Sequence, residues 1–157
     1  MTAPLFFDSP QAFRSWLELH AATASELLVG FHKVATDKPC MSWSESVDEA
    51  LCFGWIDGIR RKLDEGRTMQ LIAPRRVEHW AKSYKERAAK LIEQGKMEAA
   101  GYQSIEAAKA SGLWDFMDDV DQLLVPADLQ AELQKYPGAA DFFYAINDSS
   151  KRFVLRW

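Results

Sequence analysis

The chain has little cysteine and no long apolar run. Its two cysteines, Cys40 and Cys52, are twelve positions apart. No CxxC motif or nearby histidine pair accompanies them, so the sequence predicts neither a disulfide scaffold nor a zinc site. No apolar run approaches the roughly 20 residues that span a bilayer, and the N-terminus lacks the basic and apolar regions of a secretory signal. We therefore expect a cytoplasmic protein without membrane insertion, bound metal or cofactor.

Several catalytic signatures are also missing. The sequence has no G-x-S-x-G nucleophile motif, no Gly-rich phosphate loop and no H-E-x-x-H motif. Its three histidines, His20, His32 and His79, are scattered without a partner at ligand spacing. We therefore assign no catalytic residue from a motif, and we do not expect an enzyme as the first interpretation.

What the chain does have is enough apolar material for a core. Its 157 residues are 48% hydrophobic and 27% charged. A chain of this length buries roughly two-thirds of its unfolded surface, so we expect one domain over residues 1–157. Charge is uneven, because residues 59–90 contain ten Lys or Arg and four acids, whereas residues 98–148 contain ten acids and two lysines. The basic segment can attract an anionic ligand, or the two segments can neutralise each other across the fold.

Hydrophobic periodicity predicts the elements of the first half. Ser9 followed by Pro10 is typical of a helix start, and this helix is expected to end near residue 22. Alternation over residues 26–33 predicts a strand. Ser42 and Glu45 have the spacing of a capping box, which begins a helix expected to end near residue 55. The extended runs 59–63 and 68–73, joined by Asp-Glu-Gly, predict a β-hairpin.

The second half is predicted to be helical. One helix is expected to stop at Gly95 and the next at Gly112, followed by a loop over residues 113–125. Two short helices are expected to begin at the prolines 126 and 137, and a last helix at Ser149, ending at Trp157. The predicted fold is α+β: a small antiparallel sheet of about three strands, including the hairpin at 59–73, packed with several α-helices.

Two motifs connect the chain to a known family. The first is DEALCFGWIDG at residues 48–58. The second follows Pro-Arg-Arg at residues 74–76 and reads W-x-K-x-x-K-E-R-x-x-x-L-I-x-x-G-x-M over residues 80–97. In both, the chain resembles the YdeI/OmpD-associated, bacteriocin-protection family, from Phe6 to Trp157. The resemblance implies an α+β fold and a bacterial protein associated with stress response and with resistance to bacteriocins and other antimicrobial compounds.

The chain departs from that family at two places. Ala81 and Tyr84 stand where family members usually carry Ser and Asn, so a role for that polar pair is not expected here. Similar chains also usually continue past the position of Trp157 into a basic segment, so we expect this sequence to end early relative to the family.

The candidate polar groups of a site are Asp57, Arg75 and Arg76. Asp57 lies between an isoleucine and a glycine at a predicted turn. It can act as a general acid or base, or it can cap the turn by accepting backbone N–H bonds. The two arginines follow the hairpin, and their guanidinium groups suit a carboxylate or phosphate. They can equally form salt bridges with the acidic C-terminal third.

Tryptophans are the candidate walls of a pocket. Trp43, Trp55 and Trp80 can line an apolar cleft, although tryptophans at helical spacing are typical of a protein core. We expect Trp55, Asp57, Arg75, Arg76 and Trp80 to form a ligand-binding site.

These residues support three hypotheses about function. The first is a non-catalytic protein that binds a small molecule or peptide in a cleft. The second is an enzyme that modifies an antimicrobial compound, with Asp57 as acid or base. The third is an interaction module that binds a protein partner through the basic face of residues 59–90. Nucleic-acid binding is not expected, because the chain as a whole carries a net charge of −4.

Overall fold

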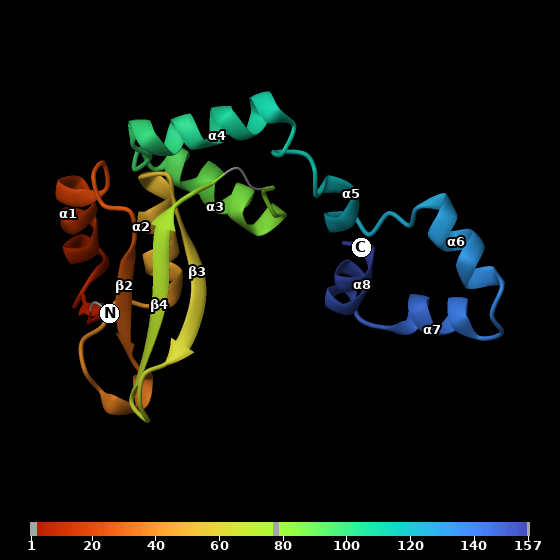
Figure 1. Ribbon diagram of the computed structural model, residues 1–157, viewed down its shortest axis with the longest axis horizontal. Helices are drawn as coiled ribbons and strands as arrows, with labels where there is room; N and C mark the ends of the chain where they lie inside the picture. Colours follow the sequence, from red (N-terminus) through yellow and green to blue (C-terminus); the bar gives the residue numbers. More distant parts are fainter. Residues whose placement is uncertain (1–2, 77–78, 157) are drawn as a thin grey trace.

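The protein is built around one four-stranded sheet (Figure 1). The computed structural model describes residues 3–76 and 79–156. The strands, in spatial order β1-β2-β4-β3, are β1 (Leu5–Phe6), β2 (Leu27–His32), β3 (Trp55–Lys62) and β4 (Arg67–Pro74). β1 is parallel to β2, whereas the β2–β4 and β3–β4 pairs are antiparallel. The α+β class is confirmed, but the sheet has four strands rather than about three and is mixed. The two residues of β1 are too few to show an alternating pattern in the sequence.

Helices occupy most of the rest of the described chain. They are α1 (Pro10–His20), α2 (Trp43–Cys52), α3 (Lys82–Glu93), α4 (Ala99–Ser111), α5 (Asp118–Asp121), α6 (Ala127–Gln134), α7 (Ala139–Ala145) and α8 (Asp148–Leu155), with a 3-10 turn η1 (Val34–Thr36). None of the helices in these residues is long and apolar enough to cross a membrane.

The predicted helix starts at Ser9 and Ser42 are confirmed by their caps. The Ser9 hydroxyl accepts a hydrogen bond from the Ala12 N–H at 3.2 Å, and the capping box of Ser42 and Glu45 is formed. Two expectations were wrong. The loop over residues 113–125 contains α5, and α8 is capped by Asn147 rather than Ser149, because the Asn147 side chain accepts the Ser150 N–H at 2.8 Å. The predicted helix end at Trp157 lies outside the described residues.

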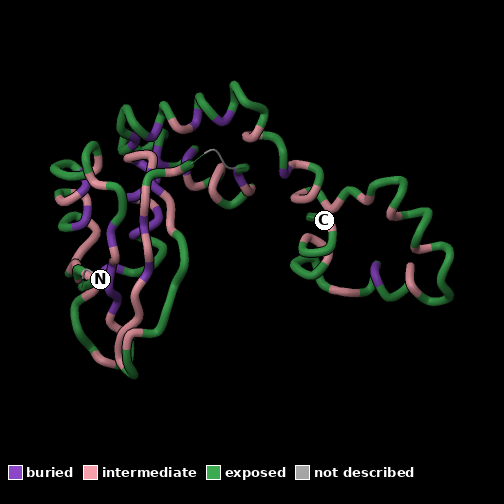
Figure 2. Tube along the Cα trace, in the orientation of Figure 1, coloured by how far each residue is buried: buried purple, intermediate pink, exposed green. Residues whose placement is uncertain are grey.

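Two clusters of buried side chains form the core. In the first, α1 and α2 cover one face of the sheet, where Phe13 and Leu17 pack with Val29, Trp55 and Ile72. The second lies among α2, α3 and α4 and contains the buried side chains Val47, Leu51, Cys52, Trp80, Ala88, Leu91, Met97, Ile105 and Ala108. Figure 2 shows the buried positions concentrated in the part of the molecule formed by the sheet and α1 to α4. Helices α5 to α8 extend to one side of it. The prediction of one domain stays a prediction.

The junction between α2 and β3 lies close to the backbone of α4. Gly54 has a φ of +74°, and a Cβ atom there would lie 2.8 Å from the Ala100 carbonyl oxygen. With α4 in its observed position, a Cβ atom added to Gly101 would lie 2.6 Å from the Cys52 carbonyl oxygen. Cys52 also accepts the Glu98 N–H at 3.0 Å. Glycine is therefore required on both sides of this contact, because any larger residue would push α4 away from the turn.

We predict that Gly54→Ala destabilises the fold more than Gly95→Ala. Gly95 has a similar φ of +71° but no heavy atom within 4 Å of its added Cβ, so it is a matched control for backbone strain alone. Strain costs about 1–2 kcal/mol at either position. The contact with Ala100 adds about 1–3 kcal/mol at Gly54. Urea unfolding of the two variants measures the difference, and equal losses would show that the approach of α4 is not a tight constraint.

Candidate functional site

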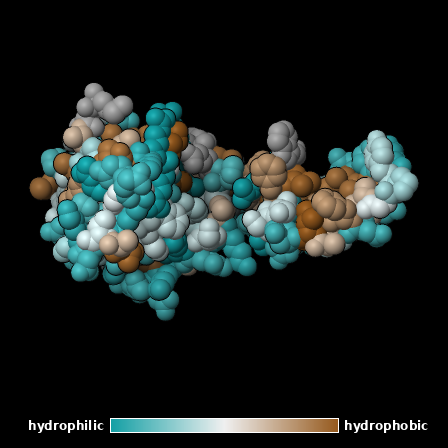
Figure 3. Space-filling model, turned by 90° about the horizontal axis from the view of Figure 1, so that it is seen from below, coloured by the Kyte–Doolittle hydropathy of each residue, from teal (hydrophilic) through white to brown (hydrophobic). Residues whose placement is uncertain are grey.

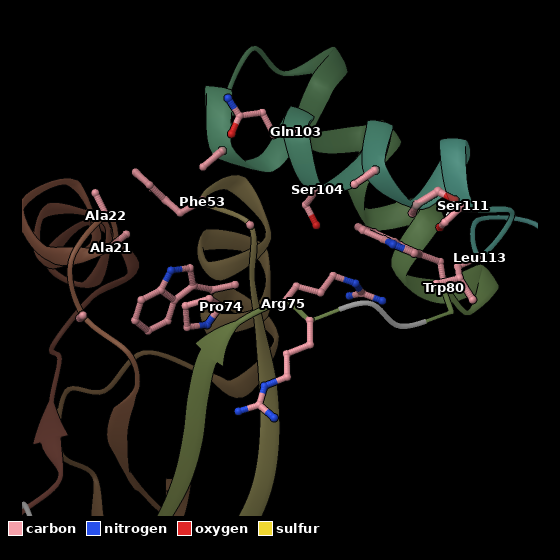
Figure 4. Close-up of a pocket in the computed structure, with 17 residues that line it drawn as sticks. Ala21, Ala22, Phe53, Pro74, Arg75, Trp80, Gln103, Ser104, Ser111 and Leu113 are labelled. Atoms are coloured by element: carbon pink, nitrogen blue, oxygen red, sulfur yellow. Dashed lines mark hydrogen bonds between the residues drawn. The ribbon is translucent and has the colours of Figure 1, made fainter.

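A pocket of about 500 Å³ opens between α4 and the end of the sheet (Figure 4). We name it the α4 pocket. Its lining comes from four places: the segment after α1 with Ala21, Ala22 and Ala24; the turn at 53–55; residues 74–76 with Trp80 and Leu113; and α4 itself. Figure 4 shows the alanines after α1 and Phe53 on one side, and Trp80, Ser111 and Leu113 on the other. The volume is in the range of small-molecule sites.

One face of α4 forms the roof of this pocket. Its lining residues recur at helical spacing and are all small or uncharged: Ala100, Gln103, Ser104, Ala107, Ala108 and Ser111. Small side chains leave the space that larger residues on this face would fill. The Ser104 side chain points from α4 toward Arg75 in Figure 4, so the roof also offers a hydroxyl to a ligand.

Arg75 is positioned by three features of the fold. Its backbone N–H donates to the Gly54 carbonyl at 2.8 Å, which ties the end of β4 to the glycine turn. Its guanidinium carbon lies 3.8 Å from the centroid of the Trp80 ring, and Nη2 donates to the His79 carbonyl at 3.0 Å. A cation–π contact of this kind holds the guanidinium over the face of the indole. Arg75 and Arg76 are the two charged residues among the described residues that line the α4 pocket.

The predicted site residues are brought together in part. Trp55, Arg75, Arg76 and Trp80 all line the α4 pocket. Trp55 and Trp80 are also core residues, with exposed fractions of 1% and 2%, so each tryptophan serves both roles that the sequence left open. Asp57 is not among the lining residues. Ligand binding by these residues stays a prediction.

Asp57 instead is the centre of a hydrogen-bond cluster beneath α2 and α3. Its Oδ1 accepts from the Tyr84 hydroxyl at 2.7 Å, and its Oδ2 accepts from Gln70 Nε2 at 3.1 Å and from Trp43 Nε1 at 3.3 Å. Gln70 also donates to the Gly58 carbonyl at 3.0 Å. The carboxylate therefore joins β3 to β4, α2 and α3. The predicted turn at Asp57 was wrong, because Asp57 lies within β3. Its contacts are those of a structural acceptor, and the donors are side chains.

Sequence reasoning missed Gln70 and gave Tyr84 no role. Gln70 is 3% exposed, and a buried amide needs polar partners, so its place in a strand between apolar neighbours was the signal available. Burial raises the pKa of the Tyr84 phenol from 10.0 to about 12, and the hydrogen bond to Asp57 acts in the same direction. The phenol therefore stays protonated and remains a donor to Asp57.

Other reactive groups do not add to the site. Cys52 is fully buried, and burial raises the pKa of its thiol to about 11, so it is a poor nucleophile at neutral pH. Cys40 is a half-buried free thiol. Within residues 3–76 and 79–156, no group of three or more metal-ligating side chains comes together.

We predict that Tyr84→Phe destabilises the protein by about 1–2 kcal/mol at neutral pH, because the carboxylate of Asp57 then loses the hydrogen bond that the Tyr84 hydroxyl donates. The control is Tyr102→Phe, since Tyr102 is exposed on α4 and its loss should cost little. The effect depends on pH in a defined direction. Since the folded pKa is above the unfolded value, this stabilisation is complete below pH 10 and declines as the pH rises to about 12.

Urea unfolding over this alkaline range measures the second part of the prediction. The difference in unfolding free energy between the parent and Tyr84→Phe should shrink from pH 10 toward about pH 12. A difference that stays constant across the range would contradict the hydrogen bond as its cause.

Comparisons with known proteins match two segments of the chain, residues 5–104 and residues 122–157, to different families. No curated protein and no solved structure matches the chain. The model described as "Bacteriocin-protection, YdeI or OmpD-Associated" matches residues 122–157, so the predicted resemblance is supported for that segment. The model described as "Domain of unknown function (DUF8412)" matches residues 5–104, which include the sheet, the glycine turn and most of the α4 pocket. Since this match covers more than half of the sequence, the chain belongs to the DUF8412 family.

Proposed function

We propose that the α4 pocket binds a small molecule or peptide end that joins an anionic group to an apolar body. The observation that carries the proposal is the lining itself, which places two arginines beside apolar side chains. A guanidinium in a site with apolar walls attracts a carboxylate or phosphate more strongly than one in bulk water. The alanines, together with the accessible side chains of Phe53, Pro74 and Leu113, suit an apolar group on the same ligand.

The preorganisation of Arg75 supports the same proposal. Its side chain is already stacked on Trp80 and bonded to the His79 carbonyl, so little rotamer entropy remains to be lost when an anion binds. Arg76 is exposed beside it and supplies a second positive charge at the mouth of the pocket.

A binding role is consistent with the family description that covers residues 122–157. A protein that holds the C-terminal carboxylate of an antimicrobial peptide, or an acidic antimicrobial compound, would keep it from its target. We propose sequestration rather than chemical modification, because both oxygens of Asp57 accept hydrogen bonds from the protein itself and Asp57 is not part of the pocket lining.

We predict that 2-naphthoate, an apolar ring with one carboxylate, binds in the α4 pocket. In a nuclear magnetic resonance titration, the amide signals of Gly54 and Ser104 should shift and saturate, and neutral 2-naphthamide should bind much more weakly. Arg76→Gln should raise the dissociation constant about tenfold, which corresponds to about 1.4 kcal/mol. Arg61→Gln is the matched control, because Arg61 is exposed on the hairpin outside the pocket lining.

Two further ligands distinguish the source of the anion. Naphthyl phosphate tests a phosphate, and a short peptide ending in tryptophan, compared with its C-terminal amide, tests a peptide carboxylate. The proposal is contradicted if none of the three acids gives a saturable shift at Gly54 and Ser104, or if Arg61→Gln weakens binding as much as Arg76→Gln.

A further inference from the structure

The C-terminal arm, which we define as residues 118–156, has almost no core of its own. It contains α5 to α8, and Phe143 is its one buried residue among those described. Its helices are four, eight, seven and eight residues long. Helices this short are marginal in water unless an apolar face packs against another surface. The arm therefore needs a partner surface to cover it.

Large apolar side chains on the arm are exposed instead of packed. Phe142 is 70% exposed, Tyr136 is 65% and Phe153 is 64%, and Leu124 is also exposed. Figure 3, which views the molecule from below, shows hydrophobic residues gathered over the arm. Soluble proteins rarely leave such a patch uncovered, so the arm has the character of an interaction surface.

The arm is also acidic over most of its length. Residues 118–148 contain seven acids and one lysine, Lys135. Asp118 pairs with Lys85 and Asp121 caps the Lys82 N–H, which fixes the base of the arm to α3. At the end of α6, Glu132 pairs locally with Lys135. Among residues 3–76 and 79–156, no ion pair joins an acid of the arm to the basic hairpin. That hairpin pairs locally too, through Lys62 with Glu65 and Arg67 with Asp64.

One face of the sheet is not covered by α1 and α2, and we name it the outer sheet face. It carries apolar and basic residues. The strand register places Leu28 opposite Leu71, and Met69 opposite both Gly30 and Arg61. Leu28, Met69 and Leu71 are half-buried, and Arg61 is exposed. In Figure 1 no described helix crosses this side of β4. The outer sheet face is therefore apolar with a basic margin, and complements an apolar, acidic arm.

We propose that the C-terminal arm docks on the outer sheet face of a second copy of this chain, and that the two copies exchange arms reciprocally. Reciprocal exchange closes the assembly as a symmetric dimer, because each copy offers one arm and one sheet face. The match is both apolar and electrostatic, so the arm's phenylalanines lie against the leucines of the sheet and its acids lie near the hairpin cations. The proposal is independent of ligand binding in the α4 pocket.

Sedimentation velocity of the full chain over a concentration series tests this inference. We expect a dimer that dissociates on dilution. Leu71→Glu on the sheet and Phe142→Ser on the arm should each weaken dimerisation about tenfold or more. Arg61→Glu should weaken it in the same direction with no risk to the core, since Arg61 is exposed. Leu19→Ser is the matched control, because Leu19 is 78% exposed on α1 and outside both surfaces.

Mixing the two variants identifies which surfaces meet. Leu71→Glu retains an intact arm and Phe142→Ser retains an intact sheet face, so the mixture should form a heterodimer through one native contact. A chain that is monomeric at every concentration would overturn the proposal. So would a dimer broken by Phe142→Ser but unchanged by both Leu71→Glu and Arg61→Glu, because that result means that arms pair with arms.

Discussion

The contact between the α2–β3 turn and α4 is the constraint on which the rest of the site depends. At Gly54 and Gly101 the two backbones approach so closely that neither position accommodates a Cβ without moving a carbonyl. The turn that touches α4 also accepts the N–H of Arg75, so one small segment positions a helix, a strand end and a charged side chain. The α4 pocket is the space left beside this contact, where alanine and serine replace larger residues.

The charged part of the pocket is connected to the core through aromatic packing. Arg75 stacks on Trp80, whose ring lies 5.0 Å from that of Trp114 and packs among α2, α3 and α4. The Trp80 N–H donates to the Leu113 carbonyl, which joins the segment before α3 to the end of α4. A binding group held in this way is rigid before a ligand arrives, which favours recognition of one anion geometry over adaptable contact.

The sequence predicted well those features that depend on interactions between residues close together in the chain. The Ser9 cap, the capping box at Ser42 and the hairpin turn act within a few residues, and each was predicted close to its observed place. Trp55, which the sequence offered as a candidate wall of a pocket, does line the α4 pocket. The partners of Asp57 were not predictable, because Gln70 and Tyr84 are 13 and 27 residues away and meet it only through the tertiary fold. The two-residue β1 was missed because it has no periodicity.

Native-state hydrogen exchange is the most direct test of the central claim. Exchange at the amides of Arg75 and Glu98 reports on the two backbone bonds, to Gly54 and Cys52, that hold the turn against β4 and α4. If the contact is the constraint described, both amides should exchange only through opening with a free energy close to that of global unfolding. Fast exchange at either amide, while the amides at the centre of β4 stay protected, would show that α4 and the pocket open independently of the sheet and would contradict the account.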